Sequence, residues 1–300
     1  MHKKILLTGI NGQVGHALKT KFPQDEVIAL SREQLDLTKS HEIRRIVREI
    51  KPHLIINPAA YTAVDKAESE PELAFAINAT AAQILAEEAA RLNAALIHFS
   101  TDYVYDGTKS NAYVETDETN PASVYGKSKL AGEEAIRAVA LPHLILRTSW
   151  VYGAYGKNFL KTILRLVAER DSLRIVSDQF GAPTSSESIA DAVVQLIENW
   201  QMAQENQSGI YHFTNSGETS WHGFSCEITN EYNKLIKDKN WPALKTSIEN
   251  IMAITTAEYP LPAPRPANSR LDNTKLKQTF NVELPTWQAG LQQVMQTLVL

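Results

Sequence analysis

A tyrosine and a lysine stand four residues apart in the segment Tyr125-Gly-Lys-Ser-Lys129. On a helix, side chains four residues apart lie on one face, so the phenol and the ammonium would be neighbours. A free tyrosine has a pKa of about 10, and a nearby cation stabilises the phenolate and lowers that pKa. The pair therefore has the chemistry of an acid–base group that gives a proton to a carbonyl oxygen.

A hydroxyl that could orient such a carbonyl stands earlier in the chain. Ser100 and Thr101 follow the apolar run 95–99, which has the pattern of a strand. Open α/β sheets bind ligands at the carboxyl edge of their strands. A Tyr-x-x-x-Lys pair on its own is commonly an exposed pair on a helix. Together with this hydroxyl, and with a glycine loop ahead of both, the pair favours catalysis.

The glycine loop follows the first apolar run, residues 5–8. Its glycines permit a tight turn and a close approach of the backbone to a pyrophosphate, and the next helix offers free N–H groups. A bare glycine pattern would be an ordinary turn, but this one joins the first strand to the first helix of an alternating chain. The residues expected to bind a dinucleotide here are Gly9, Asn11, Gly12, Gln13, Val14 and Gly15.

The residues after the second apolar run, 27–30, bear on the choice of dinucleotide. Arg32 stands where an acidic residue would hold the ribose hydroxyls of NAD, and an arginine there can pair with the extra phosphate of NADP. Glu33 is adjacent, and a solvated surface charge is the alternative for Arg32. The pattern favours NADPH over NADH. Asp36 and Leu37 reach the adenine edge or, alternatively, Asp36 caps a helix.

Small side chains follow the third apolar run, residues 54–56. Ala59 and Ala60 leave room for a cofactor beside Tyr61, although simple close packing would need the same residues.

These residues are positioned by alternating strand and helix patterns. Apolar runs at 5–8, 27–30, 54–56, 95–99 and 144–146 lack strict alternation, as do strands covered on both faces. Helical spacing separates these runs, which predicts a doubly wound, Rossmann-type α/β sheet. We expect residues 1–150 to form this dinucleotide-binding domain. Residues 151–300 should form a smaller, mixed α/β substrate-binding part, with some later strands and helices returning to the first sheet.

The second half has a less regular pattern. It predicts helices at 159–167, 189–200 and 221–235 and strands at 173–176 and 209–213. The segment 259–266 holds four of the 13 prolines, so it should be an ordered loop or a lid.

Composition excludes several functions. The net charge of -4 leaves no basic stripe for nucleic acid. No stretch approaches the about 20 apolar residues of a membrane span. The run 5–7 is too short for a signal-peptide core, so the cytoplasm is expected. One cysteine, Cys226, allows neither an internal disulfide nor a cysteine metal cluster.

With these motifs the chain resembles the extended short-chain dehydrogenase/reductase superfamily and, within it, the dTDP-4-dehydrorhamnose reductase family. The resemblance runs over nearly the whole chain. The segments that carry it are 62–68, 100–107, 124–133, 146–152, 178–184 and 265–271.

The resemblance implies reduction of the C4 keto group of dTDP-4-dehydro-L-rhamnose by NADPH, which supplies rhamnose for a surface polysaccharide. It implies a catalytic triad of Thr101, Tyr125 and Lys129, with Lys129 also on the nicotinamide ribose. The residues that it places near the nucleotide-diphosphate sugar are Val64, Asp65, Thr101, Tyr103, Tyr125 and Trp150, with Arg265 at the diphosphate. The alternatives are core packing for Val64 and Trp150, a surface acid for Asp65, and a loop salt bridge for Arg265.

Some members of the family are reported to dimerise around magnesium held by acidic side chains, one of them in the first helix. Here the segment 16–21 offers no carboxylate, although Glu187 matches another ligand position. We therefore expect no metal in catalysis and a monomer or a homodimer.

Two other functions fit the same superfamily. An epimerase-reductase such as GDP-fucose synthase needs an added Cys/His pair, and Cys226 is far along the chain from Thr101. A binding subunit that resembles the regulatory β subunit of methionine adenosyltransferase would not require an intact triad.

Overall fold

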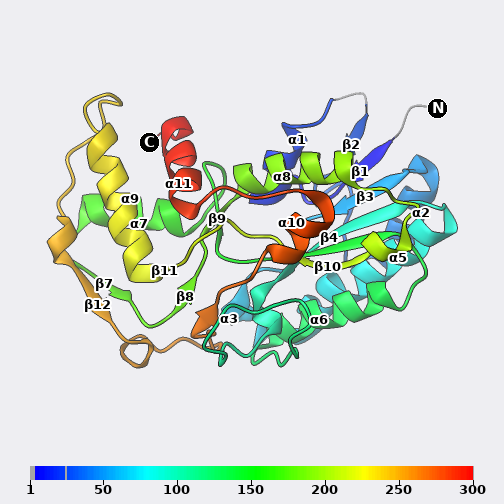
Figure 1. The fold of residues 1–300 in the computed structure, drawn as a ribbon, viewed down its shortest axis with the longest axis horizontal. Helices are drawn as coiled ribbons and strands as arrows, with labels where there is room; N and C mark the ends of the chain where they lie inside the picture. The colour runs from blue at the N-terminus through cyan, green and yellow to red at the C-terminus, as the bar shows by residue number, and fades with distance from the viewer. Residues whose placement is uncertain (1–3, 24–25, 300) are drawn as a thin grey trace.

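The computed structural model describes residues 4–23 and 26–299. Its centre is a parallel six-stranded sheet with the strand order β10-β5-β4-β3-β1-β2 (Figure 1). The strand order reverses between β1 and β3, and open α/β sheets bind ligands beside such a reversal. The strands are β1 (Ile5–Leu7), β2 (Val27–Ala29), β3 (Leu54–Asn57), β4 (Ala95–Thr101), β5 (His143–Thr148) and β10 (Gly209–His212).

The five predicted apolar runs are all strands of this sheet, and its two faces are both buried. Adjacent side chains point to opposite faces, so Leu6 packs into one core cluster and Leu7 into the other. The strand ends differ from the predicted runs by one or two residues, and in β4 the difference bears on the site, because Ser100 and Thr101 belong to the strand rather than follow it. They pair in register with Arg147 and Thr148 of β5.

Helices cover the two faces of the sheet (Figure 1). α1 and α8 pack together on one face, and α2, α5 and α6 pack side by side on the other. These helices are α1 (Gln13–Lys19), α2 (Ser40–Ile50), α5 (Ala81–Arg91), α6 (Val124–Arg137) and α8 (Ser186–Asn199). The segment between β3 and α5 folds into α3 (Val64–Ala67), α4 (Pro71–Phe75) and the π-helical turn η1 (Ala76–Thr80).

The sixth strand and one covering helix come from the second half of the chain. β10 pairs with β5 at the edge of the sheet, and α8 packs on α1. The ion pair between Lys21 and Asp191, at 2.5 Å, joins the segment after α1 to α8.

The remaining second-half elements form a smaller unit with its own core around Phe224, Ile228 and Leu291. In Figure 1, α7, α9 and α11 lie beside the large sheet rather than on it. Its helices are α7 (Phe159–Glu169), α9 (Trp221–Leu235) and α11 (Trp287–Thr297). Its strands are β6 (Val151–Tyr152), β7 (Leu173–Val176), β8 (Phe180–Gly181), β9 (Thr184–Ser185), β11 (Thr219–Ser220), β12 (Ile251–Ile254) and β13 (Asn268–Ser269). α10 (Thr274–Phe280) instead packs against β10, and its Leu276 and Phe280 belong to the core of the large sheet. Single 3₁₀ turns are η2 (Asp102–Val104), η3 (Glu205–Gln207), η4 (Ile248–Asn250) and η5 (Thr256–Glu258).

The predicted elements of the second half are found near their expected bounds. α7, α8, α9, β7 and β10 match the patterns read from the sequence, and α9 has the predicted ends. From residue 259 to 266 the proline-rich segment is a loop.

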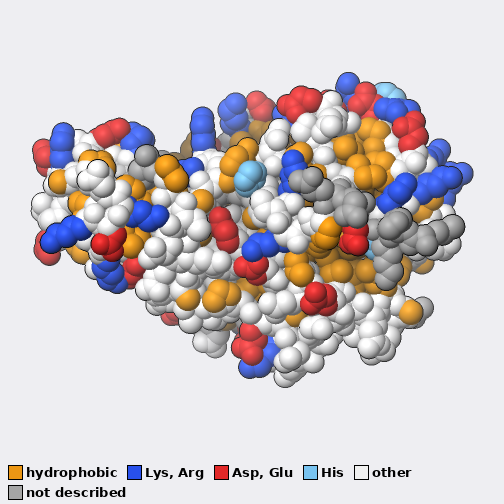
Figure 2. All heavy atoms as spheres, turned by 90° about the horizontal axis from the view of Figure 1, so that it is seen from above, with side chains coloured by type: hydrophobic (Ala, Val, Ile, Leu, Met, Phe, Trp, Pro, Cys, Tyr) orange, Lys and Arg blue, Asp and Glu red, His pale blue; other side chains and the backbone are white. Residues whose placement is uncertain are grey.

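The surface mixes both signs of charge. On the face seen in Figure 2, Lys and Arg side chains are interspersed with Asp and Glu. Among residues 4–23 and 26–299, no helix is long and apolar enough to cross a membrane.

Candidate active site

A cavity of about 680 Å³ opens beside the reversal in strand order. It is lined by the glycine loop, by the segments that follow β2 to β5, and by the first turns of α6. Most residues singled out from the sequence line it: Gly9, Asn11, Gly12, Gln13, Val14, Gly15, Arg32, Asp36, Leu37, Ala59, Ala60, Val64, Thr101, Tyr103, Tyr125, Lys129 and Trp150. Three residues from the same set, Tyr61, Asp65 and Arg265, lie outside the lining.

The glycine loop has a shape that larger residues could not keep. Gly9 has a φ of +61°, and a Cβ added there would lie 2.8 Å from the Cα of Ala59. A Cβ at Gly15 would lie 2.3 Å from the carbonyl oxygen of Gly9. The loop therefore leaves a backbone cradle in front of α1, which fits the pyrophosphate of a dinucleotide.

Replacing Gly15 with alanine should weaken NADPH binding by about tenfold or more, because the new methyl group forces the Gly9 carbonyl out of the cradle. Gly12→Ala should weaken binding less, since its Cβ would meet the same oxygen at 3.3 Å. Titration of NADPH fluorescence measures both affinities. Equal affinities in the two variants would contradict this account of the loop.

Local features of α6 bring Tyr125 to the cavity. The helix begins after Ser123, whose hydroxyl accepts a hydrogen bond from the Gly126 N–H at 3.1 Å. Gly126 lets the helix approach η2 closely, because a Cβ there would lie 2.2 Å from the carbonyl oxygen of Tyr103. The rings of Tyr125 and Tyr103 meet edge to face, with centroids 5.5 Å apart.

Thr101 lies at the centre of the site. Its hydroxyl lies beside the Tyr125 phenol, donates to Asp102 Oδ1 at 3.0 Å, and accepts from the Tyr103 N–H at 3.2 Å. Asp102 is buried and its other carboxylate oxygen has no partner among the described residues. Burial raises the pKa of Asp102 to about 6, opposed by the neighbouring hydroxyls of Ser269 and Thr101.

The protonation of the pair differs from the sequence argument, which expected Lys129 to lower the pKa of Tyr125. Burial raises the pKa of the Tyr125 phenol to about 12, opposed by the hydrogen bond with Thr101. Burial lowers the pKa of Lys129 to about 8, opposed by the charge of Glu133. Lys129 Nζ donates to the Phe99 carbonyl oxygen at 2.6 Å, so the ammonium contacts β4 rather than the Tyr125 phenol.

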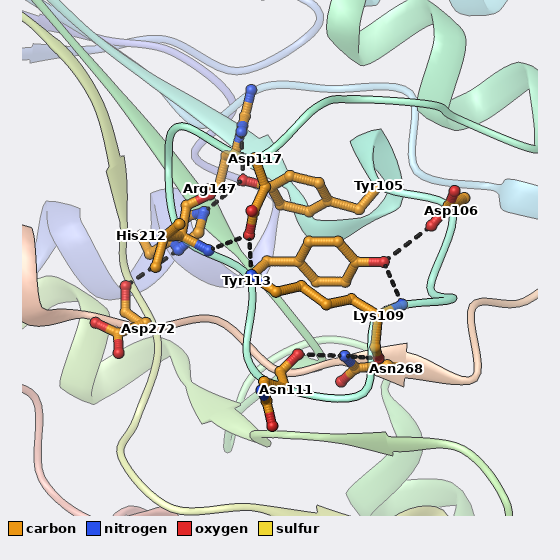
Figure 3. A network of polar contacts seen from close by, with 11 residues as sticks. Tyr105, Asp106, Lys109, Asn111, Tyr113, Asp117, Arg147, His212, Asn268 and Asp272 are labelled. Carbon is orange, nitrogen blue, oxygen red and sulfur yellow. Dashed lines mark hydrogen bonds and ion pairs between the residues drawn. The ribbon is translucent and has the colours of Figure 1, made fainter.

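A buried polar network holds α6 against the sheet. Arg147 on β5 forms a two-pronged ion pair with Glu133 at 2.5 and 2.9 Å, one helical turn beyond Lys129. Ser100 donates to the same carboxylate at 2.5 Å. Figure 3 shows Arg147 beside Tyr105 and His212, and its guanidinium donates to the Tyr105 hydroxyl at 2.6 Å. Sequence reasoning did not find this network.

The network continues into the loop after η2. His212 Nε2 lies 2.8 Å from the Tyr105 hydroxyl, and burial lowers the pKa of His212 to about 3. The side chain of Asn268, on β13, donates to the backbone carbonyls of Lys109 and Asn111 (Figure 3). The loop that follows η2, the turn that contains Tyr103, is therefore held from both sides.

Asp65 and Arg265, both expected near the substrate, are paired with each other. Arg265 NH2 lies 2.8 Å from Asp65 Oδ2, and the Ala263 N–H donates to Asp65 Oδ1 at 3.2 Å. The pair fastens the proline-rich loop to the start of α3. This is the loop salt bridge that the sequence left as the alternative for Arg265.

Trp150 has an unusual backbone conformation for a bulky residue, with a φ of +49°. Its ring stacks on Trp221 with centroids 3.6 Å apart. Gly181 allows the stack, because a Cβ there would lie 2.7 Å from the Trp150 ring. Trp221 in turn donates to Gln179 Oε1 at 3.2 Å. Sequence reasoning missed Trp221, whose only signal is an aromatic residue at a helix start.

Two further predicted residues have other partners. The Asp36 carboxylate accepts from the backbone N–H and the hydroxyl of Thr38, and this side chain does not cap α2. The Tyr61 hydroxyl donates to Glu70 at 2.6 Å.

The single cysteine is remote from the Tyr/Lys pair. Cys226 on α9 has its sulfur 3.7 Å from His222 Nε2, and neither residue lines the cavity. This Cys/His pair is therefore not beside Thr101, where an epimerase-reductase would need it.

The fold and the site define a class of protein. A glycine loop after β1, a hydroxyl at the end of β4 and a Tyr/Lys pair on α6, on a doubly wound sheet, are the features of a short-chain dehydrogenase/reductase.

Comparison with known proteins identifies the family. The model of the RmlD substrate binding domain matches residues 3–300. The dTDP-4-dehydrorhamnose reductase of Burkholderia thailandensis is 45% identical over 288 residues, which are 95% of each chain. That of Escherichia coli K12 is 41% identical over 98% of this chain and 97% of its own.

Solved structures of the same family have the same fold as this chain. The dTDP-4-dehydrorhamnose reductase of Bacillus anthracis, in complex with NADP, superposes with a TM-score of 0.89 at 33% identity, covering 99% of this chain and 100% of its own. That of Clostridium acetobutylicum has a TM-score of 0.88 at 36% identity, covering 98% and 99%. The chain belongs to the dTDP-4-dehydrorhamnose reductase family, and the resemblance predicted from its motifs is confirmed.

Proposed function

We propose that this chain reduces the C4 keto group of dTDP-4-dehydro-L-rhamnose to give dTDP-L-rhamnose. The observation that carries the proposal is the meeting of Thr101, Tyr125 and Lys129 in the cavity that the glycine loop also lines. Membership of the family supports the choice of substrate. The reaction would supply an activated deoxysugar for a surface polysaccharide, in the cytoplasm.

Each catalytic residue of the cavity has a separate role in the reduction. NADPH, when bound at the glycine loop, supplies the hydride for C4. Tyr125 gives its phenolic proton to the oxygen, and its raised pKa keeps that proton in place at neutral pH. Thr101 orients the carbonyl oxygen through its hydroxyl. Lys129 binds the hydroxyls of the nicotinamide ribose, and a proton from solvent then restores the phenol.

The substrate would lie between the two parts of the chain. Val64, Tyr103 and Trp150 line the cavity and would contact the sugar. Asp65 and Arg265 are paired next to Val64 of the lining, and we infer that Arg265 exchanges Asp65 for the substrate diphosphate, because a guanidinium binds carboxylate and phosphate oxygens alike. Residues 1–150 with α8 and β10 then act as the dinucleotide-binding domain, and the rest of 151–300 as the substrate-binding part.

The direct experiment follows NADPH absorbance in a mixture of the protein, NADPH and dTDP-4-dehydro-L-rhamnose. We expect oxidation of NADPH matched mole for mole by dTDP-L-rhamnose, without added metal. Oxidation that occurs only with another nucleotide sugar would contradict the substrate. A stable complex with a synthetase and no reductase activity would contradict the enzyme assignment.

Arg32 is exposed at the adenosine end of the cavity and should select the phosphorylated cofactor. We expect Arg32→Gln to lower kcat/KM for NADPH by about 10- to 100-fold, since a charged hydrogen bond is lost, and to change that for NADH little. Arg45→Gln, on the exposed side of α2 and paired with Glu49, is the control. An unchanged ratio of the two kcat/KM values would show that Arg32 is a solvated surface charge.

A further inference from the structure

A buried histidine beside the catalytic lysine has no role in the mechanism above. His98 lies on β4, three residues before Thr101, and is 1% exposed. Its Nε2 is 3.3 Å from Lys129 Nζ. The lysine, which is 2% exposed, therefore has two neighbours on β4, the ring of His98 and the carbonyl oxygen of Phe99.

The other ring nitrogen of His98 is linked to the glycine loop through two polar side chains. Its Nδ1 lies 3.0 Å from the side-chain amide of Asn57, at the end of β3. That amide lies 2.6 Å from the hydroxyl of Thr8, the residue that precedes Gly9. A chain of four buried side chains thus crosses β4, β3 and β1, from Lys129 to the glycine loop. Such a chain forms because these three strands are adjacent in the sheet.

The hydrogen bonds along this row of four side chains can be donated in either direction. Burial and the Lys129 charge hold the pKa of His98 well below its usual range, so its ring is neutral and carries one N–H. In the structure Asn57 Nδ2 lies 3.0 Å from His98 Nδ1 and the Thr8 hydroxyl donates to Asn57 Oδ1, so Nδ1 accepts and the ring proton is on Nε2, facing Lys129 as an amine. When Lys129 is an ammonium it donates to Nε2, and the Asn57 amide turns over so that its Oδ1 accepts from His98 Nδ1–H. When Lys129 is an amine it accepts from Nε2–H, and every hydrogen bond of the chain reverses.

We propose that His98 is a positioning residue for Lys129, which it holds through Nε2 in either charge state while Asn57 and Thr8 fix the ring. The inference rests on the proposed function, since it assigns a task to the catalytic lysine. A residue that only filled space between the strands would not need two ring nitrogens with a polar partner on each side.

The other ionisable groups around Lys129 do not replace this contact. Tyr125 and Glu133 are on its own helix. Glu133 is held by Arg147 of β5 and by Ser100. The Tyr125 phenol lies beside the Thr101 hydroxyl. Among the described residues, the polar contacts of Lys129 Nζ are therefore to His98 and Phe99 on β4.

Two replacements separate the two ring nitrogens. Glutamine at position 98 places its amide where Nε2 lies and can still contact Lys129, whereas asparagine reaches only the position of Nδ1 and keeps the contact with Asn57. We expect His98→Asn to lower kcat by about 10- to 100-fold, since Lys129 loses its anchor, with KM for the sugar changed less than about threefold. His98→Gln should recover most of the lost kcat.

The pH profile supplies a readout that a purely structural role would not move. Without an acceptor at Nε2 the ammonium is less stable, so the fall of kcat at alkaline pH should move down by about one pH unit in His98→Asn. In His98→Gln it should stay near the position of the unsubstituted protein. Thermal unfolding and NADPH affinity of both variants report whether they fold.

The outcomes are distinguishable. An active unsubstituted enzyme with equal kcat and equal pH profiles in His98→Asn and His98→Gln would overturn the role of His98. So would equal losses in two variants that are both folded and bind NADPH. An unsubstituted protein without reductase activity would instead overturn the proposed function.

Discussion

Replacing Tyr125 with phenylalanine is expected to lower kcat by about 10²- to 10⁴-fold, the usual contribution of a positioned proton donor. The variant keeps the ring that packs edge-on against Tyr103 and loses only the hydroxyl that meets Thr101. NADPH affinity should be unchanged, because the phenol is not part of the glycine loop. Steady-state kinetics and NADPH titration on the same preparation measure both quantities.

Tyr211→Phe is the matched control for this variant. Tyr211 is a buried tyrosine on β10 of the same sheet, and its hydroxyl donates to the Gln207 carbonyl oxygen away from the cavity. It should keep full activity. Unchanged turnover in Tyr125→Phe would remove the proposed proton donor. A loss of NADPH binding in the same variant would instead point to a disturbed cavity.

Replacing Glu133 with glutamine is expected to lower the free energy of unfolding by about 3–5 kcal/mol, the usual cost of leaving one charge of a buried pair unpaired. The side chains of Arg147 and Glu133 are 2% and 1% exposed, so Arg147 cannot reach solvent in the folded protein. Denaturant unfolding followed by circular dichroism measures the change. Weakened contact between α6 and the sheet should also lower activity.

Two variants test the cause of that loss. Glu49→Gln breaks the exposed pair with Arg45 and should cost no more than about 1 kcal/mol. The double variant Glu133→Leu with Arg147→Met removes both buried charges and should recover much of the stability. If Glu133→Gln were as mild as Glu49→Gln, the network would not be what holds α6.

The fold was largely predictable because its signals are local. Apolar runs without alternation mark strands covered on both faces, and all five predicted runs became strands of the sheet. The glycine loop was predictable because a turn between a strand and a helix has strict steric demands. Gly9 and Gly15 meet those demands by a positive φ and by close backbone contact.

The contacts inside the site were less predictable because they depend on strand order. Asn57 and His98 are 41 residues apart, and Asp65 and Arg265 are 200 apart. No local pattern identifies such partners. The spacing of Tyr125 and Lys129 is visible in the sequence, but the depth at which the fold buries them is not. Burial turned out to be the main influence on the pKa of both groups.

The proposed reaction transfers hydride from NADPH to C4 of the sugar and leaves the hydrogens at C3 and C5 in place. NADPH that carries deuterium at both C4 positions of the nicotinamide, used with dTDP-4-dehydro-L-rhamnose, tests this transfer when the product is analysed by NMR. The account predicts one deuterium at C4 of the product. It also predicts that unlabelled NADPH in D₂O adds no deuterium at C3 or C5 beyond an enzyme-free control. A product without label at C4, or with enzyme-dependent solvent deuterium at C3 or C5, would contradict it.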